Sequence, residues 1–90
     1  MKQTATLRAL SQPLLKAGQL SIHPNDGFDL GMMTTGYEVE LEGAGRTELR
    51  LRNECPRDSL ELPPQLWASL GKPAHVVLKY DGRRLFIEPR

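Results

Sequence analysis

Several features that would point to a particular compartment are scarce or missing in these 90 residues. The chain has a single cysteine, Cys55, so no internal disulfide can form, as is typical of a reducing cytoplasm. No apolar run approaches the length of a membrane-spanning helix or of the hydrophobic part of a secretory signal. The length allows one small domain, residues 1–90, whose core is marginal by area alone. We therefore expect a cytoplasmic protein that has no membrane partner.

Groups that carry catalysis or bind metals are equally sparse. The two histidines, His23 and His75, form no metal-ligand spacing with Cys55 or with the scattered carboxylates. Residues 26–29 lack the regular oxygen spacing of a calcium loop, and no glycine-rich loop leads into a helix as in a phosphate-binding site. Cys55 is interpreted as a loop thiol rather than a nucleophile. The sequence thus predicts no catalytic residue, no cofactor and no metal, and hence no enzyme.

The net charge of +1 is distributed unevenly along the chain. Residues 1–45 hold three Lys/Arg and five Asp/Glu, whereas residues 46–90 hold nine and six. A basic cluster in the second half is a candidate for contact with DNA phosphates, and it consists of Arg46, Arg50, Arg52 and Arg57. The alternative is a solvated surface on which these arginines form salt bridges.

Two stretches, 37–42 and 47–52, alternate apolar and charged residues, which is typical of half-buried strands. The glycine-rich break at 43–45 joins them into a hairpin, residues 37–53. The expected register pairs apolar residues on one face and opposite charges on the other: Leu41 with Leu49, Val39 with Leu51, Glu40 with Arg50 and Glu38 with Arg52. This register also supplies two of the arginines with acidic neighbours, which disfavours a nucleic-acid role.

Residues 59–90 predict a strand, a short helix and a second hairpin. The strand covers 60–62, and the helix covers 65–70 because Pro64 can begin it and Gly71 can end it. The dipeptide Asp81-Gly82 is a strong signal for a two-residue hairpin loop. The expected register pairs Leu78 with Leu85, Val76 with Ile87 and, on the opposite face, Val77 with Phe86. Because both faces are partly apolar, this unit is expected to pack inside a dimer or against the N-terminal half.

Residues 1–36 give fewer signals, and we expect irregular structure with short strands there. Residues 4–10 fit a strand or the start of a helix, residues 19–23 fit a short strand that ends at Pro24, and residues 25–27 fit a turn. Residues 28–35 are left unassigned. The expected fold class is α+β and mostly β, with two β-hairpins and one short helix.

The residues of the C-terminal unit carry a family resemblance. Leu60-Glu61-Leu62-Pro63, Leu70-Gly71, Asp81-Gly82 and Leu85 to Pro89 are similar to the swapped-hairpin domain of the AbrB/MazE/SpoVT group. The resemblance implies an intertwined homodimer that acts as a transcription regulator or antitoxin and binds DNA through basic residues. Arg50, Arg52 and Arg57 would occupy the positions of those basic residues.

Two functions follow as expectations. The first is a small DNA-binding transcriptional regulator or antitoxin-like protein that acts as a dimer. The alternative is a non-enzymatic protein–protein interaction module, a small inhibitor or adaptor that presents a sheet edge or the Trp67 region to a partner. Trp67 fits either a core anchor or an interface hot spot, and we expect the interface to include Trp67, Val77 and Phe86.

Overall fold

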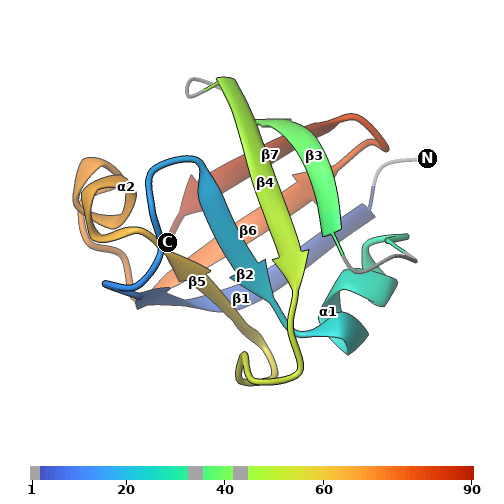
Figure 1. Ribbon diagram of the computed structural model, residues 1–90, viewed down its shortest axis with the longest axis horizontal. Helices are drawn as coiled ribbons and strands as arrows, with labels where there is room; N and C mark the ends of the chain where they lie inside the picture. The colour runs from blue at the N-terminus through green and yellow to red at the C-terminus, as the bar shows by residue number, and fades with distance from the viewer. Residues whose placement is uncertain (1–2, 33–35, 42–44) are drawn as a thin grey trace.

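The computed structural model describes residues 3–32, 36–41 and 45–90 of the chain, so that Gly43 and Ala44 of the expected turn lie outside the described residues. Nine elements follow one another: β1 (Gln3–Ser11), β2 (Gln19–Ile22), α1 (Pro24–Asp29), β3 (Gly36–Leu41), β4 (Gly45–Leu51), β5 (Ser59–Leu62), α2 (Pro64–Ser69), β6 (His75–Tyr80) and β7 (Arg84–Pro89). The strands close into a barrel in the spatial order β1-β5-β2-β4-β3-β7-β6, and β6 pairs with β1 (Figure 1). The inward-facing side chains form one core: Leu7, Leu20, Ile22, Leu30, Met32, Val39, Leu41, Leu49, Leu60, Leu62, Val76, Leu78, Tyr80 and Leu85.

The expected fold class, with two hairpins, one short helix and a swapped-hairpin dimer as one possible arrangement, is wrong. Over the residues that the structure describes, the protein is a mostly β, seven-stranded closed barrel with two short helices. Parallel pairings of β1 with β5, β2 with β4 and β3 with β7 join segments that are distant in sequence. The apolar face of the C-terminal hairpin is therefore covered within the same chain, and Leu78 and Leu85 are fully buried. Dimer formation as such stays a prediction.

The register expected for the first hairpin is wrong by four residues. Leu41 pairs with Gly45 rather than with Leu49, and Val39 pairs with Thr47. The strands extend closer to the turn than expected, and Gly45 begins β4 at a φ of 79°, which glycine adopts without strain. Because the displacement is an even number of residues, the same side chains still face the core. The expected charge pairs are lost, however, and Glu38 lies opposite Glu48.

The second hairpin differs from its expected register by two residues. Leu78 pairs with Ile87, and Tyr80 pairs with Leu85. The cause lies in the turn, where Asp81 Oδ1 accepts hydrogen bonds from the backbone N–H groups of Arg83 (2.9 Å) and Arg84 (2.7 Å). Together with the backbone hydrogen bond from the Asp81 N–H to the Arg84 carbonyl (3.3 Å), these bonds place the turn at Gly82 and Arg83 instead of at Asp81 and Gly82.

The barrel contains two copies of the same strand-strand-helix-strand unit. The first repeat consists of β1, β2, α1 and β3, and the second consists of β4, β5, α2 and β6, with β7 as an additional strand. From the first strand through the helix, equivalent residues lie 40 positions apart. The backbone N–H to carbonyl hydrogen bonds that recur in both repeats include those from Arg8 to Asp58 (2.8 Å) and from Glu48 to Gly18 (2.8 Å), and those from Gln12 to Leu62 (2.7 Å) and from Arg52 to Ile22 (2.9 Å).

The two repeats are interlocked rather than side by side. Strand β1 pairs with β5 and β6 of the second repeat, and β4 pairs with β2 and β3 of the first. Across the described residues, each strand of a repeat pairs only with the other repeat or with β7. Helices α1 and α2 consequently lie on opposite sides of the barrel (Figure 1). Neither repeat contains a sheet of its own, so each depends on the other for its backbone hydrogen bonds.

Candidate functional site

The four arginines predicted to contact DNA lie in β4 and in the loop that follows it. Each of them has a carboxylate within 4 Å: Glu38 for Arg46 (3.1 Å), Glu48 for Arg50 (2.5 Å), Glu54 and Glu61 for Arg52 (3.7 and 3.9 Å) and Asp26 for Arg57 (3.3 Å). Their charges are compensated at short range. This arrangement agrees with the alternative of a salt-bridged surface, while DNA contact by these residues stays a prediction.

Arg57 belongs to a structural anchor between α1 and the loop before β5. Its partner Asp26 is only 3% exposed, and Asp26 Oδ2 accepts a hydrogen bond from the backbone N–H of Asp58 at 2.7 Å. Asp26 Oδ1 accepts a second hydrogen bond from Arg57 Nε at 3.3 Å. Asp58 has a φ of 59°, an uncommon conformation for a residue with a side chain. The buried carboxylate therefore holds a tight bend in place.

The three predicted interface residues occupy two places. Trp67 is half-buried on α2, where it packs against the core and its indole Nε1–H donates a hydrogen bond to the carbonyl of Pro73 at 3.0 Å. Val77 and Phe86 lie on the outward face of β6 and β7, because their neighbours in sequence point into the barrel. Val77 is buried and Phe86 is half-buried. Trp67 is thus a core anchor in the isolated chain, and contact of all three residues with a partner stays a prediction.

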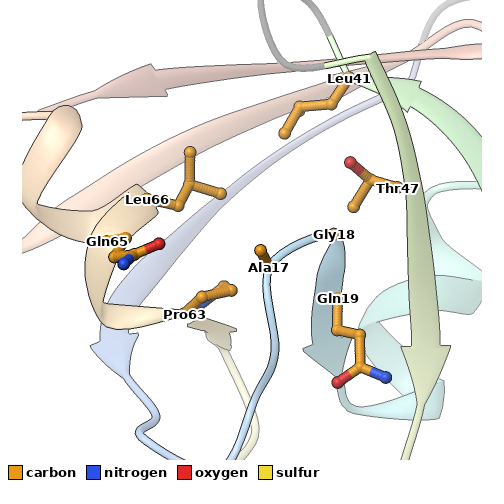
Figure 2. A pocket seen from close by; sticks show the side chains of 8 residues that line it. All are labelled: Ala17, Gly18, Gln19, Leu41, Thr47, Pro63, Gln65 and Leu66. Carbon is orange, nitrogen blue, oxygen red and sulfur yellow. The ribbon is translucent and has the colours of Figure 1, made fainter.

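A pocket opens at the mouth of the barrel beside α2. It has a volume of 270 Å³, and we call it the mouth pocket; its lining residues are Ala17, Gly18, Gln19, Leu41, Thr47, Pro63, Gln65 and Leu66. Figure 2 shows the side chains of Leu41, Leu66 and Thr47 directed into this space, whereas the amide of Gln19 points away from it. The Gln19 amide instead accepts a hydrogen bond from the backbone N–H of Lys16. The pocket therefore combines aliphatic walls with a few hydrogen-bonding groups, as ligand sites usually do.

A second hollow, of 410 Å³, lies where β3, the start of β4 and the loop before β7 meet. Its lining carries both signs of charge, with Arg46 and Arg83 beside Glu38 and Glu40. A site for a polyanion needs an excess of positive charge. The balanced charge makes this hollow a weaker candidate than the mouth pocket.

Cys55 belongs to the loop that joins β4 to β5, and its side chain is directed into the protein. Its side chain is 1% exposed, and its Sγ lies 3.7 Å from the carbonyl oxygen of Ser21 and 3.8 Å from that of Ser59. Burial, together with the nearby carboxylate of Glu61, raises the pKa of Cys55 from 9.0 to about 12. The thiol is therefore neutral at physiological pH and has no nucleophilic character.

We expect the thiol of the native protein to resist alkylation. With a pKa of about 12, roughly one thiol in ten thousand is ionised at pH 8, and the sulfur is covered as well. Labelling by iodoacetamide at pH 8 should be at least about 100-fold slower than in guanidinium chloride, where the pKa returns to its ordinary value. Because the chain has one cysteine, mass spectrometry over time measures this rate directly. Equal rates for the native and denatured protein would contradict the placement of Cys55.

Comparisons with known proteins leave the site to be interpreted from its chemistry. No family model matches the chain, and no curated protein or solved structure matches it either. Among the residues that the structure describes, no three His, Cys, Asp or Glu side chains come together in a way that could hold a metal ion. The same residues include no helix with the length and apolar character of a membrane crossing.

The mouth pocket and the Asp26 anchor were both missed from the sequence. The signal that could have found them is the repeat itself, because Leu20-Ser21-Ile22, Pro24 and Leu30-Gly31 recur as Leu60-Glu61-Leu62, Pro64 and Leu70-Gly71. Aligning these two segments places Leu66 of α2 in the position of Asp26 of α1. The alignment would have shown that one helix carries a carboxylate where the other carries an aliphatic side chain.

Proposed function

We propose that the chain is a non-enzymatic protein-interaction module, a small cytoplasmic adaptor or inhibitor, that contacts its partner at the mouth pocket. The observation that carries this proposal is the exposed aliphatic pocket beside α2, with Leu41 and Leu66 directed into it. Leu14, in the same β1–β2 connection that supplies Ala17 and Gly18, leaves 87% of its surface exposed. Apolar groups around a concave site are typical of recognition surfaces.

The closure of the barrel decides which form of recognition is proposed. A partner can add a strand to a sheet only where an edge strand has unpaired backbone groups. Each of the seven described strands has a neighbour on both sides. This disfavours the expected presentation of a sheet edge and leaves the α2 side, next to Trp67, as the proposed contact surface.

A site-specific crosslink tests this proposal. The photoreactive residue p-benzoylphenylalanine is placed at Gln65, an exposed residue that lines the pocket, and at Asn25, its exposed equivalent in the first repeat. Irradiation in cells should give a discrete protein adduct from position 65 and none from position 25. Adding Leu66→Ser to the position 65 chain should remove the adduct, since the aliphatic wall is lost. Equal adducts from both positions, or none from either, would overturn the proposal.

DNA binding by a regulatory dimer is the second candidate. It is favoured by Arg46, whose side chain is 86% exposed and lies near Arg83. This candidate is tested by the electrophoretic mobility of random duplex DNA in the presence of the purified protein at two salt concentrations. A DNA-binding protein should lose affinity steeply as salt rises, and Arg46→Ala with Arg50→Ala should weaken binding and reduce the salt dependence. Unretarded DNA at low salt would remove this candidate.

A further inference from the structure

The two repeats fill equivalent places in different ways. In the first repeat, the side chain of Asp26, the third residue of α1, crosses to the bend before β5 and bonds to the N–H of Asp58 at 2.7 Å. The guanidinium of Arg57 lies on the other oxygen at 3.3 Å. The space between the helix and the bend is therefore occupied by a carboxylate that belongs to the chain itself.

In the second repeat the backbone is the same, but these side chains are absent. Leu66 of α2 stands where Asp26 does, while Ala17 and Gly18 stand where Arg57 and Asp58 do. Gly18 adopts the same left-handed conformation as Asp58, with φ of 82° against 59°. The carbonyls of Gly18 and Asp58 also accept equivalent hydrogen bonds, each at 2.8 Å, from backbone N–H groups of the opposite repeat. The equivalence of the two bends would direct the N–H of Gly18 toward α2, as that of Asp58 is directed toward Asp26 of α1.

The mouth pocket lies at this place. Gly18, Ala17 and Leu66 line it, and the N–H of Gly18 has no acceptor among the described residues. The hydroxyl of Thr47 and the amide of Gln65 also border the space. Among the residues that the structure describes, none of those that line the pocket is acidic. In the first repeat, the Asp26 carboxylate accepts the backbone N–H of the bend. Among the described residues, the second repeat supplies no equivalent acceptor for the N–H of Gly18.

We propose that the mouth pocket binds an aspartate or glutamate side chain of a partner protein, whose carboxylate accepts the N–H of Gly18 as Asp26 accepts the N–H of Asp58. The methylene groups of that side chain lie against Leu41 and Leu66. This inference rests on the proposed interaction function and names the chemistry of its contact. The volume of 270 Å³ is below the roughly 300–1,000 Å³ of sites for drug-sized ligands, which favours a side chain over a whole small molecule.

Capped peptides test the inference on the full chain. The ¹⁵N-labelled protein is titrated with acetyl-Leu-Asp-amide and with the neutral isostere acetyl-Leu-Asn-amide, and the amide resonances are followed by NMR. The acidic peptide should shift the Gly18 resonance and bind about tenfold more tightly than the neutral one, because hydrogen bonds to an ionised acceptor are roughly twice as strong. Shifts centred on Lys16 or Arg46, or equal affinities for the two peptides, would overturn the inference.

A substitution inside the pocket provides an independent check. Leu66→Asp reproduces the chemistry of Asp26 and should occupy the Gly18 N–H from within, so that the acidic peptide no longer binds. Leu66→Asn is the matched neutral control and should retain more of the binding. Unchanged binding by a folded Leu66→Asp chain would overturn the inference, and if that chain does not fold, the acid–amide comparison on the unmodified protein decides. If the crosslink from position 65 gives a protein adduct but the acidic and neutral peptides bind equally, the carboxylate contact is refuted and the proposed interaction function still stands.

Discussion

A fragment of residues 45–90 is expected to be unfolded as a lone chain, although it contains β4, β5, α2, β6 and β7. Strands β4 and β5 pair only with strands of the first repeat, so in the fragment neither has a partner. Fully buried residues such as Leu49, Leu60 and Val76 would face water. The β6–β7 hairpin alone is not enough, because an isolated two-stranded hairpin is marginally stable at best.

Circular dichroism and NMR of the fragment at micromolar concentration measure this directly, with the full chain as the folded reference. Any folded population that appears on concentration should be dimeric in a sedimentation experiment, because only a second copy can take the place of the first repeat. A fragment that folds cooperatively as a monomer would contradict the interlocked pairing. Of the two partners expected for the C-terminal unit, a second copy or the N-terminal half, the structure shows the N-terminal half of the same chain.

Helix α2 and the strands other than β1 could be predicted because their signals are local, whereas residues 4–10 fitted either a strand or the start of a helix. Alternation of apolar and charged residues indicates β3 and β4, and a proline followed seven residues later by a glycine marks the helix over Pro64–Ser69. The inward faces were also predictable, since both registers differ from the expected ones by an even number of residues. The exact registers were not, because they depend on how the turns close, and the Asp81 hydrogen bonds that displace one turn are a feature of the folded loop.

Helix α1 could not be predicted because its residues have turn chemistry. Asn25, Asp26 and Gly27 are poor helix formers, and glycine costs about 1 kcal/mol relative to alanine inside a helix. The helix forms because His23 Nδ1 accepts the N–H of Asn25 at the start, and because Leu51 of β4 packs against Gly27. A Cβ at Gly27 would lie 2.7 Å from a Leu51 methyl. The close packing that favours glycine at this position therefore involves a residue of β4 that is 24 positions away in the sequence. Such a requirement has no local signal.

Closure of the barrel escaped prediction for the same physical reason. Parallel pairing joins β1 to β5 and β3 to β7 across most of the chain, and no turn links the paired strands. The sequence does contain the repeat. A repeat alone, however, does not show that the strands of each copy pair with strands of the other copy. The role of Arg57 is a further consequence, since its partner Asp26 is on a helix that the sequence did not predict.

Asp26→Ala is expected to lower the free energy of unfolding by about 2–3 kcal/mol. This is the largest loss of stability that we predict for a single substitution. The substitution leaves the Asp58 N–H without its acceptor and Arg57 without its carboxylate. Asp58 must also keep its left-handed bend without support. Asp26→Asn retains an oxygen for the N–H but removes the charge, so its loss should be smaller, about 1 kcal/mol.

Urea denaturation of the three chains at neutral pH measures these differences, with Asp29→Ala as the matched control. Asp29 ends the same helix but is exposed, so its removal should change the free energy of unfolding by less than about 0.5 kcal/mol. A loss for Asp26→Ala no larger than that of the control would show that the carboxylate does not hold the bend. It would also weaken the carboxylate proposal for the mouth pocket, because that proposal takes the Asp26 contact as its template. A clear difference between the native chain and the asparagine variant would instead show how much of the contact depends on charge, the same quantity that the acid–amide comparison measures on the opposite side of the barrel.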